Sequence, residues 1–179
     1  MVFIMIGTSF SFVFFGFSSA SETVRYNGIA FKLIPRDGIW IAKINGHNAA
    51  FSFLPEEVKD ILAPPDMSSL LQNRLEIDVT YDPQGNFTES IALAQHQMSL
   101  TLEKYNVYVR KGFTSNNTYG MPIITCNESS FNVPVIYFLG SNSTMIRHEG
   151  NCIIAQASSN KDFIRAKDRI LYAVLEILK

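Results

Sequence analysis

The sequence predicts an α+β domain: a mixed β-sheet with an N-terminal three-stranded meander, one βαβ-like unit and a long C-terminal helix packed on the sheet. Three observations lead to this fold class. Hairpin turns at Asp37-Gly38 and Asn45-Gly46 separate short runs of β-branched and aromatic residues. Residues 74–113 read in turn as strand, helix and strand, and an apolar helical pattern fills residues 161–179.

The first part of the chain, Met1–Phe17, contains no charged residue. As a helix it would extend about 25 Å, slightly less than the roughly 30 Å hydrocarbon core of a bilayer. Small residues at 18–20 resemble a signal-peptide cleavage site, although no Lys or Arg precedes the apolar run. We interpret residues 1–20 as a membrane anchor or signal segment, either cleaved or the end of a longer anchor, and residues 21–179 as one extracytoplasmic domain.

The meander occupies the beginning of that domain. Residues 21–28 are expected to form a polar tether that ends in an Asn27-Gly28 turn. Three strands then follow, at residues 29–35, 39–44 and 49–54. A short helix is predicted over residues 55–62, because a proline and two acidic residues suit the first turn of a helix.

The βαβ-like unit comes next, after a short helical turn at residues 67–73. Residues 74–81 alternate apolar and polar side chains, which is typical of a half-buried strand. Residues 89–104 carry apolar side chains on one helical face, and residues 106–113 return to alternation. We expect the two strands to be parallel and joined by a right-handed crossover.

Four short strands and a helix complete the prediction. The strands are expected at residues 122–125, 133–139, 144–148 and 152–157, with 133–139 apolar enough to be buried on both faces. A capping box at Ser159–Asp162 begins the helix over residues 161–179. The apolar face of this helix is unusually wide, so it either lies between the sheet and a neighbouring element or docks a partner or a second copy.

Charge and cysteine usage limit the functional classes. The chain has 15 basic and 16 acidic residues and a net charge of -1, which argues against nucleic acid or anionic lipid as the main partner. Cys126 and Cys152 form an even pair, and in an exported chain we expect them to be bridged. Such a bridge would contribute roughly 3 to 4 kcal/mol. The candidate glycosylation sites are the four Asn-x-Ser/Thr residues Asn86, Asn116, Asn127 and Asn142.

No catalytic, cofactor-binding or metal-binding residue is assigned from the sequence. The acidic group around the turn after residue 81 suggests calcium, but its spacing does not match an EF-hand loop; it comprises Asp78, Asp82, Asn86 and Glu89. The best enzyme hypothesis is a thiol nucleophile, Cys126 or Cys152, with His148 as its base. A further group of aromatic residues either lines a recognition surface or packs in the core: Trp40, Tyr26, Tyr105, Tyr108 and Tyr119.

Two stretches carry a resemblance to a known group of proteins. These are YNGIAFKLIPRDGIWIAKINGHNAAFSFLPEEV after the apolar N-terminus, and GNCIIAQAS followed by DRILYAVLEIL. They resemble membrane-anchored or exported proteins of small-genome archaea, a group with no established activity. The resemblance implies a cell-envelope setting and supplies no functional residue.

The predicted function is therefore a membrane-tethered or exported cell-envelope domain with a binding or structural role and an unknown ligand. Its partner is the membrane, through the N-terminal segment. One alternative is an extracytoplasmic thiol-dependent enzyme. The other is a module that associates with a protein partner, or with itself, through the C-terminal helix.

Overall fold

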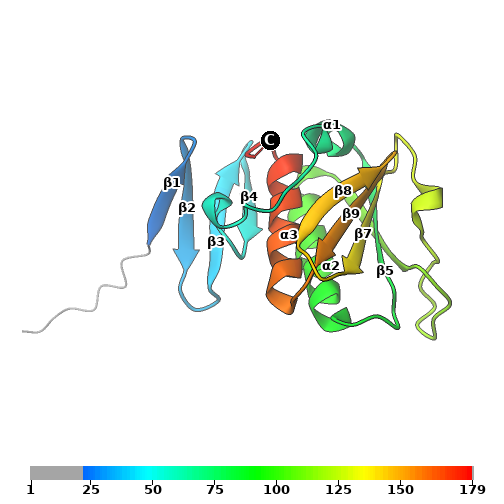
Figure 1. Ribbon diagram of the computed structural model, residues 1–179. Helices are drawn as coiled ribbons and strands as arrows, with labels where there is room; N and C mark the ends of the chain where they lie inside the picture. Colours follow the sequence, from blue (N-terminus) through cyan, green and yellow to red (C-terminus); the bar gives the residue numbers. More distant parts are fainter. Residues whose placement is uncertain (1–21, 179) are drawn as a thin grey trace, which may run out of the picture.

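The computed structural model describes residues 22–178 and arranges them in three layers (Figure 1). A four-stranded antiparallel sheet lies on one side, a five-stranded mixed sheet on the other, and two long helices lie between them. The predicted α+β class, with a C-terminal helix packed on a sheet, is confirmed. The predicted anchor, residues 1–20, lies outside the described residues, and within residues 22–178 no helix combines the length and the apolar character needed to cross a bilayer.

The antiparallel sheet contains one strand more than the sequence predicted. Its order is β1-β2-β3-β4, with β1 at Thr23–Tyr26, β2 at Ile29–Ile34, β3 at Ile39–Ile44 and β4 at His47–Phe51. The tether predicted at the start of this region instead forms β1, because Val24 faces Phe31 across the hairpin and joins the buried side of the sheet. Asn27 and Gly28 both have positive φ, as a two-residue hairpin turn of this twist requires.

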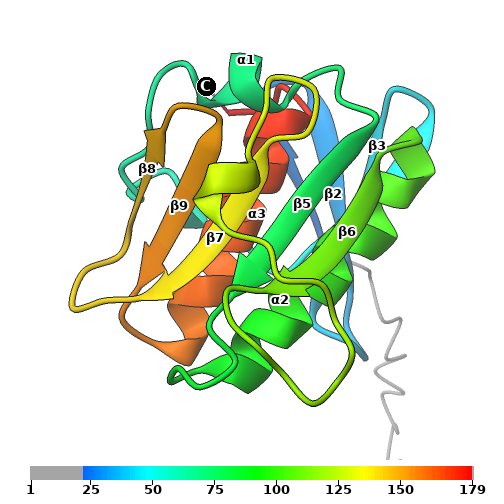
Figure 2. The same ribbon diagram turned by 90° about the vertical axis from the view of Figure 1, so that its right-hand side faces the viewer.

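The five-stranded sheet has the order β6-β5-β7-β9-β8 and is parallel except for β8 (Figure 2). Its strands are β5 (Glu76–Tyr81), β6 (Tyr108–Phe113), β7 (Val135–Gly140), β8 (Met145–Glu149) and β9 (Cys152–Ala157). The predicted parallel β5-α2-β6 unit is confirmed. The strand predicted at residues 122–125 is absent from this sheet, because only Ile123 forms a bridge, with Phe113.

The helix layer consists of α2 (Thr88–Leu102) and α3 (Asn160–Val174), which pack against each other and against both sheets. Ser159 caps α3 by accepting the Asp162 amide N–H, as the sequence predicted. The helix ends at Val174 rather than at residue 179, because Glu176 adopts a positive φ of 61° and turns the chain back. The remaining short elements are α1 (Met67–Leu71) and the 3-10 turns η1 (Pro55–Glu57), η2 (Glu103–Tyr105) and η3 (Cys126–Glu128). The helix expected over residues 55–62 is thus a single turn, η1.

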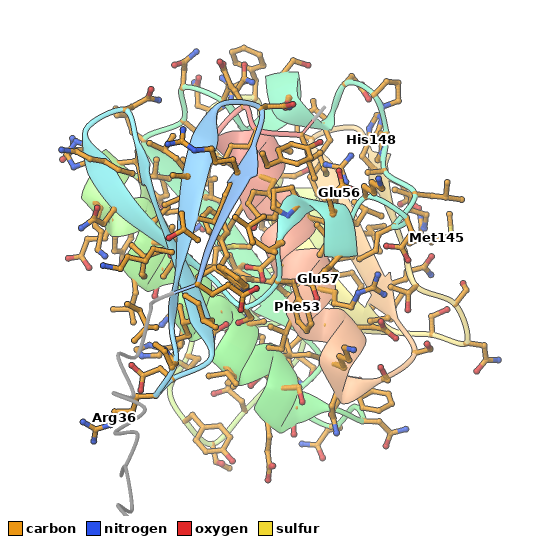
Figure 3. The ribbon with its side chains drawn as sticks, turned by 90° about the vertical axis from the view of Figure 1, so that its left-hand side faces the viewer. Arg36, Phe53, Glu56, Glu57, Met145 and His148 are labelled. Carbon is orange, nitrogen blue, oxygen red and sulfur yellow. A yellow bond between two sulfur atoms is a disulfide. The ribbon has the colours of Figure 1, made fainter. Side chains whose placement is uncertain are left out.

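Burial of α3 explains its wide apolar face. The Tyr172 ring stacks on Phe51 of β4 at 4.4 Å and meets Phe31 of β2 edge-on at 6.1 Å. On the other side Phe163 packs against Phe138 of β7. Figure 3 shows the antiparallel sheet from outside, with Arg36 at the far end of the β2–β3 hairpin. Among the described residues, the large apolar side chains of α3 are buried or half-buried, so packing between the two sheets accounts for its wide apolar face. Association with a partner or a second copy through this helix stays a prediction.

Candidate functional site

Successive strands of the five-stranded sheet are added on opposite sides of β5, so the strand order changes direction between β5 and β7. From β5 the chain passes through α2 to β6 on one side, and later places β7 on the other side of β5. In open α/β sheets, ligands bind outside the carboxyl ends of the strands at such a reversal. A ligand is therefore expected to bind at the segments that follow β5 and β7.

A cavity of about 440 Å³ lies at this position. Asp82 comes directly after β5, Ser141 and Asn142 come after β7, and Ser158 comes after β9. The other side of the cavity is formed by Asn86 and Phe87, which precede α2. The site therefore gathers segments that are up to 76 positions apart in sequence, from residue 82 to residue 158 (158 − 82 = 76).

Phe87 has an unusual backbone at the wall of this cavity. Its φ of 68° lies in the left-handed region, which a bulky residue rarely adopts and which costs roughly 1 to 3 kcal/mol. Its ring packs against Phe163 of α3, with ring centroids 5.5 Å apart. No side chain caps α2 at Phe87, so the first amide N–H groups of the helix have no side-chain acceptor there.

The charge of the cavity comes from one side chain. Among the described residues, Asp82 is the only ionisable acid or base that lines it besides Tyr137. Asp82 Oδ1 accepts the Gln84 amide N–H at 2.9 Å. Burial raises the pKa of Tyr137, and the nearby Asp82 carboxylate raises it further, so the phenol stays protonated at neutral pH. Hydroxyl, amide and carboxylate groups thus line one cavity together with the rings of Phe87 and Tyr137.

The disulfide lies on the outer face of the five-stranded sheet, opposite the helices. Cys126 and Cys152 are bonded, with their Cα atoms 5.2 Å apart, which confirms the predicted pairing. The bond attaches η3 to β9 over a small apolar cluster that includes Ile124 and Val135 (Figure 2). A disulfide-bonded fold is typical of proteins in oxidising compartments.

An ion pair between a buried carboxylate and a partly exposed guanidinium lies on the same outer face. Asp78 of β5 is fully buried, and its carboxylate accepts two hydrogen bonds from Arg110 of β6, its parallel neighbour. These bonds raise the pKa of the Arg110 guanidinium, although its burial opposes this. Asp78 is therefore engaged in the sheet, away from the cavity that contains Asp82.

A second buried polar cluster, which no sequence pattern predicts, lies between α3 and the end of β4. Asp168 Oδ2 accepts the amide N–H groups of Ser52 and Phe53 at 2.8 and 2.9 Å, and its Oδ1 accepts from Lys167. Tyr172 donates its hydroxyl proton to the Phe53 carbonyl oxygen. Figure 3 shows Phe53 beside Glu57 where η1 passes over α3. The sequence places Lys167, Asp168 and Arg169 in succession on α3, a pattern typical of a solvated helix face, so no local signal marks this cluster.

The four sequon asparagines, Asn86, Asn116, Asn127 and Asn142, are all exposed. Two of them, Asn86 and Asn142, also line the cavity between β5 and β7. A glycan on either residue would cover the cavity mouth. Their use as glycosylation sites stays a prediction.

The other hypotheses from the sequence find little geometric support. Within residues 22–178 no group of three or more His, Cys, Asp and Glu side chains is placed to hold a metal ion. His148 lies one position from the partner of Cys152 in the β8–β9 pairing, so it faces the opposite side of the sheet. Both sulfurs are bonded, and the thiol nucleophile therefore has neither a free thiolate nor an adjacent base.

The five aromatic residues singled out in the sequence have different surroundings, and Tyr26 packs half-buried against the main core. Trp40 is buried in the main core, and Tyr105 donates to the Ile44 carbonyl oxygen. Tyr108 is exposed on β6, and Tyr119 packs on Phe113 in the loop after that strand. Core packing therefore explains the presence of the large Trp40 side chain on β3.

Comparison with protein-family models, curated proteins and solved structures finds no match to this chain. The resemblance to archaeal envelope proteins therefore stays an expectation from the sequence.

Proposed function

We propose that this chain is an extracytoplasmic binding domain of the cell envelope, tethered to the membrane through residues 1–20. We further propose that it binds a small, neutral, hydroxyl-rich molecule, such as a sugar residue, in the cavity between β5 and β7. The observation that carries the proposal is this 440 Å³ cavity at the reversal point of the sheet. The disulfide supports the extracytoplasmic location.

The groups around the cavity favour a neutral ligand. The Asp82 carboxylate repels an anion, while the amide N–H groups at the start of α2 disfavour a cation. Carboxylate, amide and hydroxyl groups provide both acceptors and donors for hydroxyl groups. The rings of Phe87 and Tyr137 offer flat surfaces for the apolar face of a sugar.

Binding is tested on the full chain with a panel of methyl glycosides by saturation-transfer NMR. Asp82→Asn removes the charge and keeps an amide oxygen for the Gln84 N–H, so the turn is preserved. Because a hydrogen bond to a charged group contributes about 1.5 to 3 kcal/mol, we expect affinity to fall roughly ten- to hundredfold. Asp37→Asn, in the exposed β2–β3 turn, is the matched control and should bind as the natural chain does.

Two results would contradict the proposal. One is the absence of signal from every glycoside at about 10 mM, which corresponds to a negligible affinity. The other is a glycan on Asn86 or Asn142 in native protein, detected by peptide mass spectrometry, because it would occupy the cavity mouth. The proposal expects any glycans at Asn116 and Asn127 only.

A further inference from the structure

A second, smaller cavity opens between β4 and α2, and it shares no lining residue with the cavity between β5 and β7. Its volume is about 160 Å³. We call it the β4–α2 cavity. Its walls are largely apolar and come from Ile39 of β3, Ala50 and Phe51 of β4, and Leu100 of α2.

Lys167 lines this cavity from α3, and its side chain is only 1% exposed. Within the described chain its ammonium has one hydrogen-bond partner, Asp168 Oδ1. An ammonium has three N–H donors, so two remain for another acceptor. The other carboxylate oxygen of Asp168, Oδ2, is not free to accept from Lys167, because it already accepts the amide N–H groups of Ser52 and Phe53.

Among the described residues, none of the polar side chains that line this cavity accepts a hydrogen bond from Lys167. The Ser52 hydroxyl donates to Gln97 Oε1 at 3.5 Å, and the Thr101 hydroxyl donates to the Ala50 carbonyl oxygen at 3.4 Å. The exposed Lys104 provides a second cation at the rim of the β4–α2 cavity. Two ammonium groups and one carboxylate leave the region with one positive charge, which a single anionic group would balance.

We propose that the β4–α2 cavity binds a small aliphatic monocarboxylate. The ligand carboxylate accepts from the Lys167 ammonium, and its hydrocarbon tail packs against Ile39, Phe51 and Leu100. The size fits, because a cavity of about 150 Å³ accommodates a benzene molecule, which has the six heavy atoms of a four-carbon carboxylate. A phosphate or dicarboxylate brings a second charge into apolar walls, where an unpaired charge is costly.

The experiment titrates the full chain with butanoate and follows amide chemical shifts by NMR. Butanamide is the matched neutral ligand, since it has the same number of heavy atoms and lacks the charge. We expect butanoate to shift the amides of Ser52 and Thr101, and butanamide to bind at least about tenfold more weakly, as the loss of a charged hydrogen bond implies.

Two tryptophan substitutions test the location without touching the buried ion pair. Leu100→Trp fills the mouth of the cavity and should weaken butanoate binding at least about tenfold by removing the space for the tail. Leu93→Trp is the matched control on the same helix, because Leu93 is 48% exposed against 50% for Leu100 and does not line the cavity. The affinity of the Leu93→Trp variant for butanoate should change less than about twofold.

Three outcomes overturn the proposal. Equal binding of butanoate and butanamide means that the ammonium is not used. Equal binding by the two tryptophan variants places the ligand elsewhere. Absence of shifts at Ser52 and Thr101 at about 20 mM butanoate means that the cavity has no useful affinity for the carboxylate. The glycoside experiments are independent of all three.

Discussion

Asp168 is expected to be the polar residue whose replacement destabilises this protein most. It is fully buried, accepts two backbone N–H groups that fix the end of β4, and neutralises Lys167. Burial raises the pKa of Asp168, while Lys167 and the two amide groups act in the opposite direction. Asp168→Asn keeps one oxygen for the backbone amides and removes the charge that balances Lys167.

The expected cost follows from that uncompensated charge. Removing one partner of a buried ion pair destabilises a protein by about 3 to 5 kcal/mol. Asp168→Ala should cost more than Asp168→Asn, because each buried N–H left without an acceptor adds about 1 to 3 kcal/mol. The double variant Lys167→Met/Asp168→Asn removes both charges and should recover at least about 2 kcal/mol relative to Asp168→Asn.

The free energy of unfolding is measured by urea denaturation with the disulfide intact. Asp37→Asn, at an exposed turn, is the control and should lie within about 0.5 kcal/mol of the natural chain. A cost below about 1 kcal/mol for Asp168→Asn would refute the reasoning. So would a double variant whose cost equals the sum of the costs of Asp168→Asn alone and Lys167→Met alone, since the two charges would then not interact.

Three further predictions concern the outer face of the sheet and are read out by urea denaturation. Replacing Cys126 and Cys152 by serine should cost about 3 to 4 kcal/mol, because the unfolded chain regains the freedom of the closed loop. Gly112→Ala should cost about 1 to 3 kcal/mol, since the added Cβ would lie 2.7 Å from a backbone carbonyl oxygen. Hydrogen bonds from Thr125 hold the pKa of Glu128 below its ordinary value of 4.5. The stabilisation that ionised Glu128 contributes to the free energy of unfolding is therefore present above pH 4.5. It is lost as the pH falls through the lowered pKa. The difference between the natural chain and Glu128→Gln should shrink from about pH 6 to about pH 3.

Each of these predictions has its own contradicting result. Two free thiols in denatured, unreduced protein would exclude the disulfide. An unchanged midpoint for Gly112→Ala would mean that the segment after β6 does not approach this strand closely. A difference for Glu128→Gln that grows as the pH falls would reverse the sign assigned to its pKa shift.

Features encoded by neighbouring residues were predictable. The Asn45-Gly46 turn follows from the freedom of these two residues at positive φ, and both have it in the structure. The start of α3 follows from the hydroxyl of Ser159, which accepts a nearby amide N–H. The parallel β5-α2-β6 unit follows from alternation, helical periodicity and the length of the crossover.

Features that depend on distant neighbours were not predictable in the same way. Residues 23–26 are few and polar on one side, so their sequence predicts a tether, and only the pairing of β1 with β2 reveals a strand. Lys167 and Asp168 have the sequence signature of a solvated helix face. They are buried because a second sheet covers that face of α3, and no local pattern specifies where that sheet lies.

By itself, the sequence determined the fold class, the turns, the caps and the cysteine pair, since these depend on local conformational preference and on simple pairing. The tertiary structure alone decided that the helices lie between two sheets and that Asp82, Asn86 and Ser141 border one cavity. The strand order β6-β5-β7-β9-β8 brings those residues together. That order depends on the total apolar surface that many side chains bury together. A single stretch of sequence contributes only part of that surface, so it cannot specify the order.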